Sequence, residues 1–280
     1  MHLIPLLEYL NTQTLLWKYH HYHCSRIIIM KGCTIKFDDG NLSKIGFTIY
    51  LWDSIRNIYH GDRYIQLNDR VLTFDVHDAN HYHFQYLPLF HFRGLFNEAK
   101  SLNSDKDAIS LYGNYSRDRL RITNKIVNGN NKGINFRYHI SIALFTFLKE
   151  LILGNQSILL LWKYTTFTKL NKKKIDLILS ASTVTLDVAN PKQSGMTLRT
   201  FEALSHSVKL ITNNQTTVRF CSDQGIPVRF SKFENGIDID DLVTFLDEKY
   251  FISAVFINQY CIENFIKNIL NHQLREKNNE

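Results

Sequence analysis

The chain has 280 residues, 44% of them hydrophobic, and a formal net charge of +7 at pH 7. This length and composition suit one or two compact domains. The apolar runs are too short to cross a bilayer, and the first residues lack a basic leader and a small-residue cleavage site, so we expect neither a membrane-spanning nor a secreted protein. Four scattered cysteines without C-x-x-C spacing indicate reduced thiols in a cytoplasm.

The positive charge could attract nucleic acid, anionic lipid or phosphorylated substrates. The basic residues form no long block apart from Lys172 to Lys174, which is typical of a solvated helix face. We therefore expect no nucleic-acid partner, and a nucleic-acid-binding module is the weakest of the functions considered.

Strand-like runs rich in β-branched and aromatic residues alternate along the chain with segments of helical periodicity, which is typical of βα units and a mainly parallel sheet. In the first 100 residues we predict a helix at 6–19, strands at 26–32, 46–54 and 70–75, a helix from about 78 and an extended segment at 84–90. Residues 97–106 are polar enough for a linker. This first lobe begins with a helix where a complete lobe would have earlier strands, so we expect a thin lobe that could be incomplete.

A second alternating series follows residue 100. We predict strands at 108–113, 134–140, 158–162, 184–189, 208–213 and 226–230, and helices at 116–127, 143–153, 170–182, 198–206 and from about 216. The expected fold is α/β with two Rossmann-like lobes. Residues 1–100 form the N-terminal lobe, and residues 101–280 form the C-terminal lobe.

Ligands of open α/β sheets bind beyond the carboxyl ends of the strands. In the first lobe this rule selects Lys31, Gly32, Asp53, Asp75 and His77. In the second lobe it selects the turn from Gly113 to Arg119, the residues from Asp187 to Gln193 and the loop that leads into the helix at 198–206.

The loop at residues 190–197 precedes a helix for which Ser194 or Thr197 is the expected N-cap. The first N–H groups of this helix lack partners, and its dipole favours an anion. Gly195 would let a diphosphate approach the backbone, and Thr197, Arg199 and Thr200 would add donors. One turn further on, Glu202 could accept hydrogen bonds from a ribose diol. From spacing alone, a solvated ion pair between Arg199 and Glu202 explains these residues equally well.

The segment SGMTLRTFEALSHSVKLITNN resembles the donor-binding segment of GT-B glycosyltransferases, which has a Gly loop, a helix with Glu-Ala and a strand ending in Thr-Asn. More closely, the chain is similar to a bacterial family of glycosyltransferase-like proteins from capsule and lipopolysaccharide biosynthesis clusters. The matching segments, in the family's order, are IIIMKG, IYLWDSIRN, VLTFDVHDA, YLPLF, SLYGNYSRDRL and TLDVANPKQSGMTLRTFEAL, between Ile27 and Asn214.

This resemblance implies a GT-B fold, with the nucleotide sugar held mostly by the C-terminal lobe and the acceptor mostly by the N-terminal lobe. It implies that Glu202 holds the ribose and that the diphosphate lies near two loops. The residues of the expected donor site are Gly113, Asn114, Tyr115, Arg117, Arg119, Gln193, Ser194, Gly195, Met196, Thr197, Arg199, Thr200 and Glu202. In retaining members a second glutamate often stands eight residues before the ribose-binding one, and here that position is Ser194, so the stereochemical outcome stays open.

Glycosyl transfer needs stabilisation of the leaving nucleotide and, in an inverting reaction, a base for the acceptor proton. Asp53 or Asp75, with His77, could supply the base or anchor the acceptor, while capping of the following helix is the alternative for either aspartate. The histidine clusters HHYHC and HYH lack metal-ligand spacing, and the DID at residues 238–240 fits helix capping better. We expect no metal and no cofactor.

The leading hypothesis is a cytoplasmic, metal-independent glycosyltransferase of the hexosyltransferase type. It would move sugar from a nucleotide-sugar donor to a surface polysaccharide or lipopolysaccharide acceptor, a glycan or lipid-linked glycan, with possible peripheral contact to the inner face of the membrane. The alternative is a degenerate, non-catalytic relative that still binds nucleotide sugar, and it is suggested by the thin first lobe and by Ser194.

Overall fold

The computed structural model describes residues 27–31, 47–58, 61–92, 108–129, 133–154, 157–190, 193–233, 239–248, 252 and 254–279. The chain divides into two compact units. Unit 1 consists of Met1–Leu89, Asn190–Met196 and Glu263–Glu280, and unit 2 of Phe90–Ala189 and Thr197–Ile262. The helix expected at 6–19 and the linker expected at 97–106 lie outside the described residues.

Unit 1 contains a four-stranded parallel sheet with strand order β1-β2-β3-β4. Its strands are β1 (Ile27–Lys31), β2 (Phe47–Leu51), β3 (Val71–Thr73) and β4 (Gln85–Tyr86), and its helical segments are η1 (Ile55–Asn57), η2 (Gly61–Arg70), α3 (Val76–Tyr82) and nearly all of α12 (Ile262–Asn279). The central strand β2 is buried on both faces, as the unbroken apolar run predicts for a parallel strand. Tyr50 of β2 packs edge-on against Phe265 of α12, with 4.8 Å between ring centroids.

Unit 2 contains a six-stranded parallel sheet with strand order β10-β9-β8-β5-β6-β7. The strands are β5 (Ala108–Asn114), β6 (Asn135–Ser141), β7 (Thr165–Thr166), β8 (Val184–Asp187), β9 (Lys209–Thr212) and β10 (Val228–Phe230). The helices are α4 (Arg117–Gly129), α5 (Leu144–Ile152), α6 (Ile158–Tyr164), α7 (Lys172–Ser180), α8 (Leu198–Ser205), α9 (Gln215–Asp223), α10 (Ile239–Asp247) and α11 (Ala254–Gln259).

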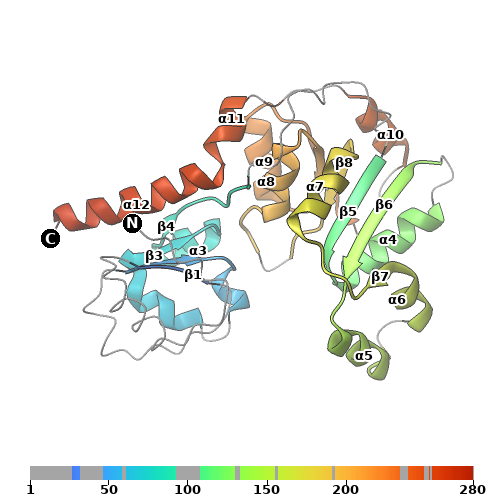
Figure 1. The fold of residues 1–280 in the computed structure, drawn as a ribbon, viewed down its shortest axis with the longest axis horizontal. Helices are drawn as coiled ribbons and strands as arrows, with labels where there is room; N and C mark the ends of the chain where they lie inside the picture. The colour runs from blue at the N-terminus through green and yellow to red at the C-terminus, as the bar shows by residue number, and fades with distance from the viewer. Residues whose placement is uncertain are drawn as a thin grey trace. The chain divides into compact units, whose positions relative to one another are not determined.

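Helices cover both faces of the unit 2 sheet (Figure 1). On one face, Ile109 and Leu111 of β5 pack in a buried cluster with residues of α4 and α10. On the other face, Tyr112 of β5 packs with residues of α7, α8 and α9. The alternation of side chains along β5 sends neighbouring residues to opposite faces, so the strand contributes to two apolar cores.

The strand order of unit 2 reverses beside β5. The chain runs outward from β5 to β6 and β7, and then returns to place β8 on the other side of β5. In open α/β sheets the crevice at such a reversal, outside the carboxyl ends of the two strands, is where ligands bind. The residues that follow β5 and β8 are therefore the first to consider for a functional site.

The strand predicted at residues 158–162 is wrong, because these residues belong to helix α6. The run Ile-Leu-Leu-Leu-Trp is apolar throughout, so its periodicity cannot distinguish a buried strand from a helix. Leucine favours helix, and only the two residues of β7 that follow join the sheet. Within the described residues, no helix has the length and apolar character needed to span a bilayer.

Candidate functional site

The carboxyl end of β8 carries a buried carboxylate that organises the start of helix α8. Asp187, the last residue of β8, is fully buried. Its Oδ2 accepts hydrogen bonds from the hydroxyls of Thr197, at 2.6 Å, and Thr200, at 3.0 Å. Its Oδ1 accepts from Nε of Arg199 at 3.1 Å. Asp187 thus fixes three of the predicted donor-site side chains against the end of the strand.

Helix α8 begins at Leu198 and is capped by Thr197, whose hydroxyl accepts a hydrogen bond from the backbone N–H of Thr200. Of the two expected N-cap residues, Ser194 and Thr197, the cap is Thr197. The N–H groups of the first turn and the helix dipole together favour negative charge at this end of α8.

Two guanidinium groups meet at the same sheet edge. Arg119 of α4 donates to the backbone carbonyls of Asn114, at 2.6 Å, and Val188, at 2.8 Å. Burial and the nearby charge of Arg199 lower the pKa of Arg119 to about 9, with Asp187 acting in the opposite direction. Arg119 still carries its proton at pH 7, so two positive charges lie close together here. Asp187 pairs directly with Arg199, while Asp187 and Asp118 act on Arg119 through their charges.

Gly113 near the end of β5 allows Arg199 to approach the strand. Its φ is +145°, a backbone conformation that residues with a Cβ rarely adopt. A Cβ at this position would lie 2.9 Å from Nη1 of Arg199 and 3.6 Å from Cζ of Arg119. The absence of a side chain at Gly113 therefore leaves space for the side chains of Arg199 and Arg119.

Glu202 lies one turn into α8 and is only 5% exposed. Tyr112 of β5 donates its hydroxyl to Oε2 of Glu202 at 2.9 Å. Burial raises the pKa of Glu202, while the hydrogen bond from Tyr112 and the charges of Lys172 and Arg199 lower it. Among the described residues Oε1 has no hydrogen-bond partner, so this carboxylate keeps an acceptor. Nothing in the sequence pattern had selected Tyr112, whose partner lies 90 residues away.

Arg117 does not join the two arginines at the sheet edge. Its guanidinium forms a two-point ion pair with Glu150 of α5, at 3.1 and 3.2 Å. Burial and the charge of Glu150 raise the pKa of the neighbouring Tyr115 to about 12. Two residues apart on α4, Arg117 and Arg119 therefore point to different surroundings. The resemblance could not distinguish them, because Glu150 lies 33 residues along the chain.

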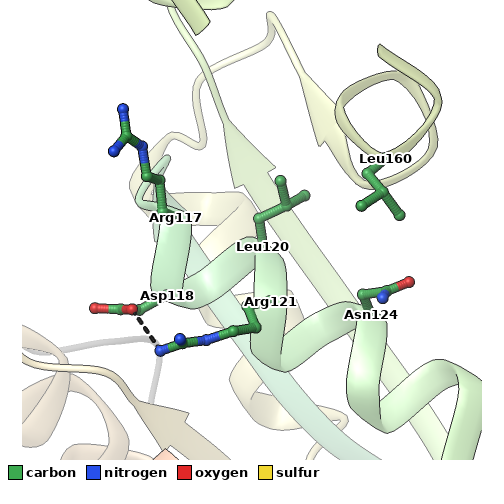
Figure 2. Close-up of a pocket in the computed structure, with 6 residues that line it drawn as sticks. All are labelled: Arg117, Asp118, Leu120, Arg121, Asn124 and Leu160. Carbon is green, nitrogen blue, oxygen red and sulfur yellow. Dashed lines mark hydrogen bonds and ion pairs between the residues drawn. The ribbon is translucent and has the colours of Figure 1, made fainter. Parts of the chain in front are cut away.

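Arg117 also lines a cavity of about 340 Å³ between α4 and α6, shown in Figure 2. The other lining residues are Asp118, Leu120, Arg121, Asn124 and Leu160. Asp118 and Arg121, three residues apart on α4, form an ion pair at 2.8 Å. Both arginines of this cavity already have carboxylate partners. The cavity therefore offers less uncompensated charge than the carboxyl ends of β5 and β8.

The remaining predicted donor residues, at 193–196, fall in unit 1 together with the predicted first-lobe residues. Asp75 follows β3, is fully buried and caps α3 by accepting from the N–H groups of His77 and Asp78. It also accepts from the N–H of Ser194 at 2.9 Å, from the hydroxyl of Ser194, and from the N–H of Gly195 at 3.3 Å. The capping alternative for Asp75 describes its observed contacts.

The environment of Asp75 stabilises its ionised form. Burial opposes ionisation, but hydrogen bonds from Ser194, Ser54 and Asp78 outweigh it and lower the pKa of Asp75. The backbone N–H of His77 donates to Asp75 and to the hydroxyl of Ser194, both at 2.9 Å. Two amides of the predicted diphosphate loop are therefore directed at a side-chain carboxylate.

Gly195 has a packing reason for lacking a side chain. A Cβ would lie 2.4 Å from the carbonyl oxygen of Phe74 and 2.7 Å from its ring. Met196 beside it is buried, and the side-chain amide of Gln193 donates to the carbonyl of Gly195 at 3.4 Å. The close approach that Gly195 permits is to Phe74, whereas the sequence had suggested approach to a ligand.

Asp53 lies after β2 and is engaged locally. Its Oδ1 accepts from the N–H of Ser54 at 2.9 Å and from the side-chain amide of Asn57 at 2.8 Å. The N-cap residue of η1 is Ser54, without a side-chain cap hydrogen bond, so the capping alternative does not describe Asp53. The histidine cluster at 20–23 and residue 238 lie outside the described residues. Within the part of the chain that the structure describes, no group of three or more His, Cys, Asp or Glu side chains could hold a metal ion.

No protein-family model matches the chain, and no curated protein matches its sequence. Among solved structures it is similar to the lipopolysaccharide outer core galactosyltransferase WaaB in its apo form, with a TM-score of 0.50 and 13% identity over 84% of this chain and 70% of that one. It is also similar to a glycosyltransferase from Rickettsia africae ESF-5, with a TM-score of 0.48 and 10% identity over 95% of this chain and 78% of that one.

The fold is therefore α/β with two parallel sheets and matches the structures of GT-B glycosyltransferases, which confirms the predicted fold class. At 13% identity the similarity defines the fold. Because one fold supports many functions, the activity has to be argued from the site residues.

Proposed function

We propose that the chain is a glycosyltransferase that binds a nucleotide-sugar donor at the carboxyl ends of β5 and β8. The observation that carries this proposal is the charge at that edge. Arg119 and Arg199 bring two mutually repelling positive charges together at the reversal of strand order and at the N-terminus of α8, where Asp187 pairs with Arg199. A diphosphate would relieve the repulsion between the guanidinium groups and accept their remaining N–H donors.

Glu202 would bind the ribose in this proposal. Tyr112 occupies one carboxylate oxygen and fixes the side-chain orientation, and the other oxygen is available to a diol. Burial makes such a hydrogen bond stronger than it would be in water, because the surroundings screen charge less. A diphosphate at Arg199 and a ribose at Glu202 lie one helical turn apart, which suits a nucleoside diphosphate.

The reaction would use the same groups. As the bond from the sugar to the diphosphate breaks, negative charge develops on the leaving nucleotide, and the two guanidinium groups and the α8 dipole would stabilise it. The proposal therefore requires no metal ion. We propose further that unit 2 is the donor side, that unit 1 with Asp53, Asp75 and His77 serves the acceptor, and that the enzyme works in the cytoplasm on a surface polysaccharide or lipopolysaccharide.

A thermal-shift screen with UDP, GDP, CDP, ADP and their sugars tests the donor site. A ligand that binds only the folded chain raises the melting temperature, by an amount set by its concentration relative to its Kd. We expect one nucleotide to do so, and Arg119→Ala to weaken its binding about 10- to 100-fold. Arg121→Ala is the matched control, because Arg121 lies on the same helix and pairs with the surface residue Asp118.

The proposal fails if no nucleotide raises the melting temperature of the parent chain, or if Arg119→Ala and Arg121→Ala bind alike. Release of nucleoside diphosphate in the presence of glycan acceptors then measures turnover.

The second candidate is a non-catalytic relative that binds nucleotide sugar. The specific observation in its favour is the loop at 193–196, where the N–H groups of Ser194 and Gly195 donate to Asp75 and where Ser194 stands in place of a second glutamate. Donor binding without hydrolysis or transfer, for every sugar nucleotide that binds, would support this candidate over the enzyme.

A further inference from the structure

Helices α5 and α6 and the residues just after them expose an unusual amount of apolar surface. Of the sixteen exposed large hydrophobic side chains among the described residues, nine lie in this short stretch, so they are concentrated rather than scattered. We call these nine the apolar face: Leu144, Phe145, Leu148, Ile152, Leu153, Ile158, Leu159, Trp162 and Phe167.

Helix α5 is apolar on its outer side as well as on its inner side. Phe147 is buried in the core of unit 2, whereas Phe145 and Ile152, on the opposite side of the helix, are 79% and 83% exposed. A surface helix of a globular protein normally has polar residues on its outer side, and a helix that is apolar all round is normally covered. The outer side of α5 therefore suits contact with another apolar surface.

Helices α5 and α6 pack against each other, so their exposed apolar side chains belong to one part of unit 2. Phe147 of α5 packs edge-on against Trp162 of α6 and against Phe167, with 5.4 Å between ring centroids in each case. Buried residues of α5 and α6 also share one cluster with Leu120 of α4. Contiguous exposed apolar patches are rare on monomeric proteins and indicate an interaction site.

The exposed charges of this stretch are all positive. Between residues 142 and 170 the charged residues are Lys149, Glu150, Lys163 and Lys169. All three lysines are exposed, whereas Glu150 is buried and its carboxylate is neutralised by Arg117. The apolar face is consequently bordered by positive charge alone among the described residues of this stretch.

We propose that the apolar face docks on a membrane surface that contains anionic lipids. Leucine, isoleucine and phenylalanine side chains would enter the boundary between headgroups and acyl chains, and Trp162 would lie at the headgroup level. The three lysines would remain among the anionic headgroups, since their long stems let the charge reach outward. A second copy of the chain fits less well, because a two-fold interface would bring the lysines of both copies together.

Flotation of the full 280-residue chain with lipid vesicles tests this proposal. We expect binding to vesicles of phosphatidylcholine with 30% phosphatidylglycerol, weaker binding at high salt, and little binding to phosphatidylcholine alone. Each of Lys149→Gln and Lys163→Gln should weaken binding about fivefold. The double variant Phe145→Ser and Ile152→Ser should weaken it at least tenfold.

Matched controls come from exposed apolar residues outside the apolar face. Leu177→Ser on α7 and Val255→Ser on α11 replace side chains that are 61% and 78% exposed and should bind like the parent chain. Circular dichroism and melting temperature should be unchanged for all variants, because every replaced side chain is exposed.

Equal binding to neutral and anionic vesicles would overturn the proposal, as would undiminished binding of the double variant. A parent dimer in sedimentation equilibrium that the double variant loses, without lipid binding, would assign the apolar face to a second copy. The inference does not depend on the proposed donor site, because neither the vesicles nor the variants involve Arg119, Arg199 or Glu202.

Discussion

The carboxyl ends of the strands differ in chemistry between unit 1 and unit 2, although both sheets are parallel. After β3, the Asp75 carboxylate receives hydrogen bonds from five residues of its own unit, Ser54, His77, Asp78, Ser194 and Gly195. After β8, the Asp187 carboxylate accepts a hydrogen bond from Arg199, and the charge of Arg199 repels that of the neighbouring Arg119. The comparison teaches that position in the fold selects candidates, while the balance of charge and donors separates a structural residue from a binding residue.

Removal of Asp187 should produce the largest effect on stability. Asp187→Ala leaves Arg199 without its counter-charge beside Arg119 and removes the acceptor of two threonine hydroxyls. We expect the free energy of unfolding to fall by about 3 to 5 kcal/mol. Urea unfolding followed by circular dichroism measures it, with Asp118→Ala as the control, since that exposed ion pair contributes less than about 1 kcal/mol.

If Asp187→Ala and Asp118→Ala lose similar stability, the buried network at the end of β8 is weaker than its geometry indicates. The contrast with unit 1 would then have to rest on the positive charges alone.

Asp75→Asn should have the next largest effect, about 2 to 3 kcal/mol at pH 7, because an amide cannot accept all of the hydrogen bonds that the carboxylate accepts. Since the folded-state pKa of Asp75 is lowered, its stabilisation is fully present above about pH 4 and is lost as the pH falls through that lowered value. The parent chain should therefore lose stability as the pH falls below about 4, while Asp75→Asn loses less over the same range.

Parallel pH profiles for the parent chain and Asp75→Asn would contradict this assignment. The same variant also tests catalysis. If the reaction needs the Asp75 carboxylate as a base, turnover by Asp75→Asn should fall well beyond the loss of folded protein.

Gly113→Ala should destabilise unit 2 by about 1 to 3 kcal/mol, since φ is positive and the new Cβ would displace Arg199. Nucleotide affinity, measured by isothermal titration calorimetry, should fall with it. Gly129→Ala is the control, because a Cβ there meets no atom within 4 Å. Unchanged affinity in Gly113→Ala would mean that Arg199 does not contact the donor.

Tyr112→Phe should have the smallest effect, about 1 kcal/mol, because it removes one hydrogen bond to Glu202 and leaves the packing in place. Without this donor, the already raised pKa of Glu202 should rise further. A pH profile of nucleotide affinity would detect the change as weaker binding at acidic pH than in the parent chain. Identical profiles would indicate that Glu202 does not bind the ribose.

Local signals predicted much of the fold, because strand propensity and helical periodicity are properties of short windows. The α/β class, most strand positions of unit 2 and the Thr197 cap follow from such signals. The run at 158–162 did not, since an apolar segment carries no periodicity to distinguish helix from strand. Its assignment to a helix is also what brings Leu159 and Trp162 to the surface.

The sequence predicted which positions belong to the candidate site. It did not predict the hydrogen-bond and ion-pair partners of each residue. The sequence pattern treated Arg117 and Arg119 alike, yet Glu150 engages one and the carbonyl groups of Asn114 and Val188 engage the other. Catalytic and donor-binding roles for these residues stay predictions until binding and turnover are measured.

By itself the sequence determined the alternation of strands and helices, and with it a parallel α/β fold whose strand ends gather the polar residues. Tertiary structure alone decided which partners those residues have. Gly195 packs against Phe74, Tyr112 donates to Glu202 from 90 residues away, and Asp187 holds Arg199. The physical reason is that propensity acts over a few residues, whereas hydrogen bonds, burial and charge depend on groups that only folding brings together.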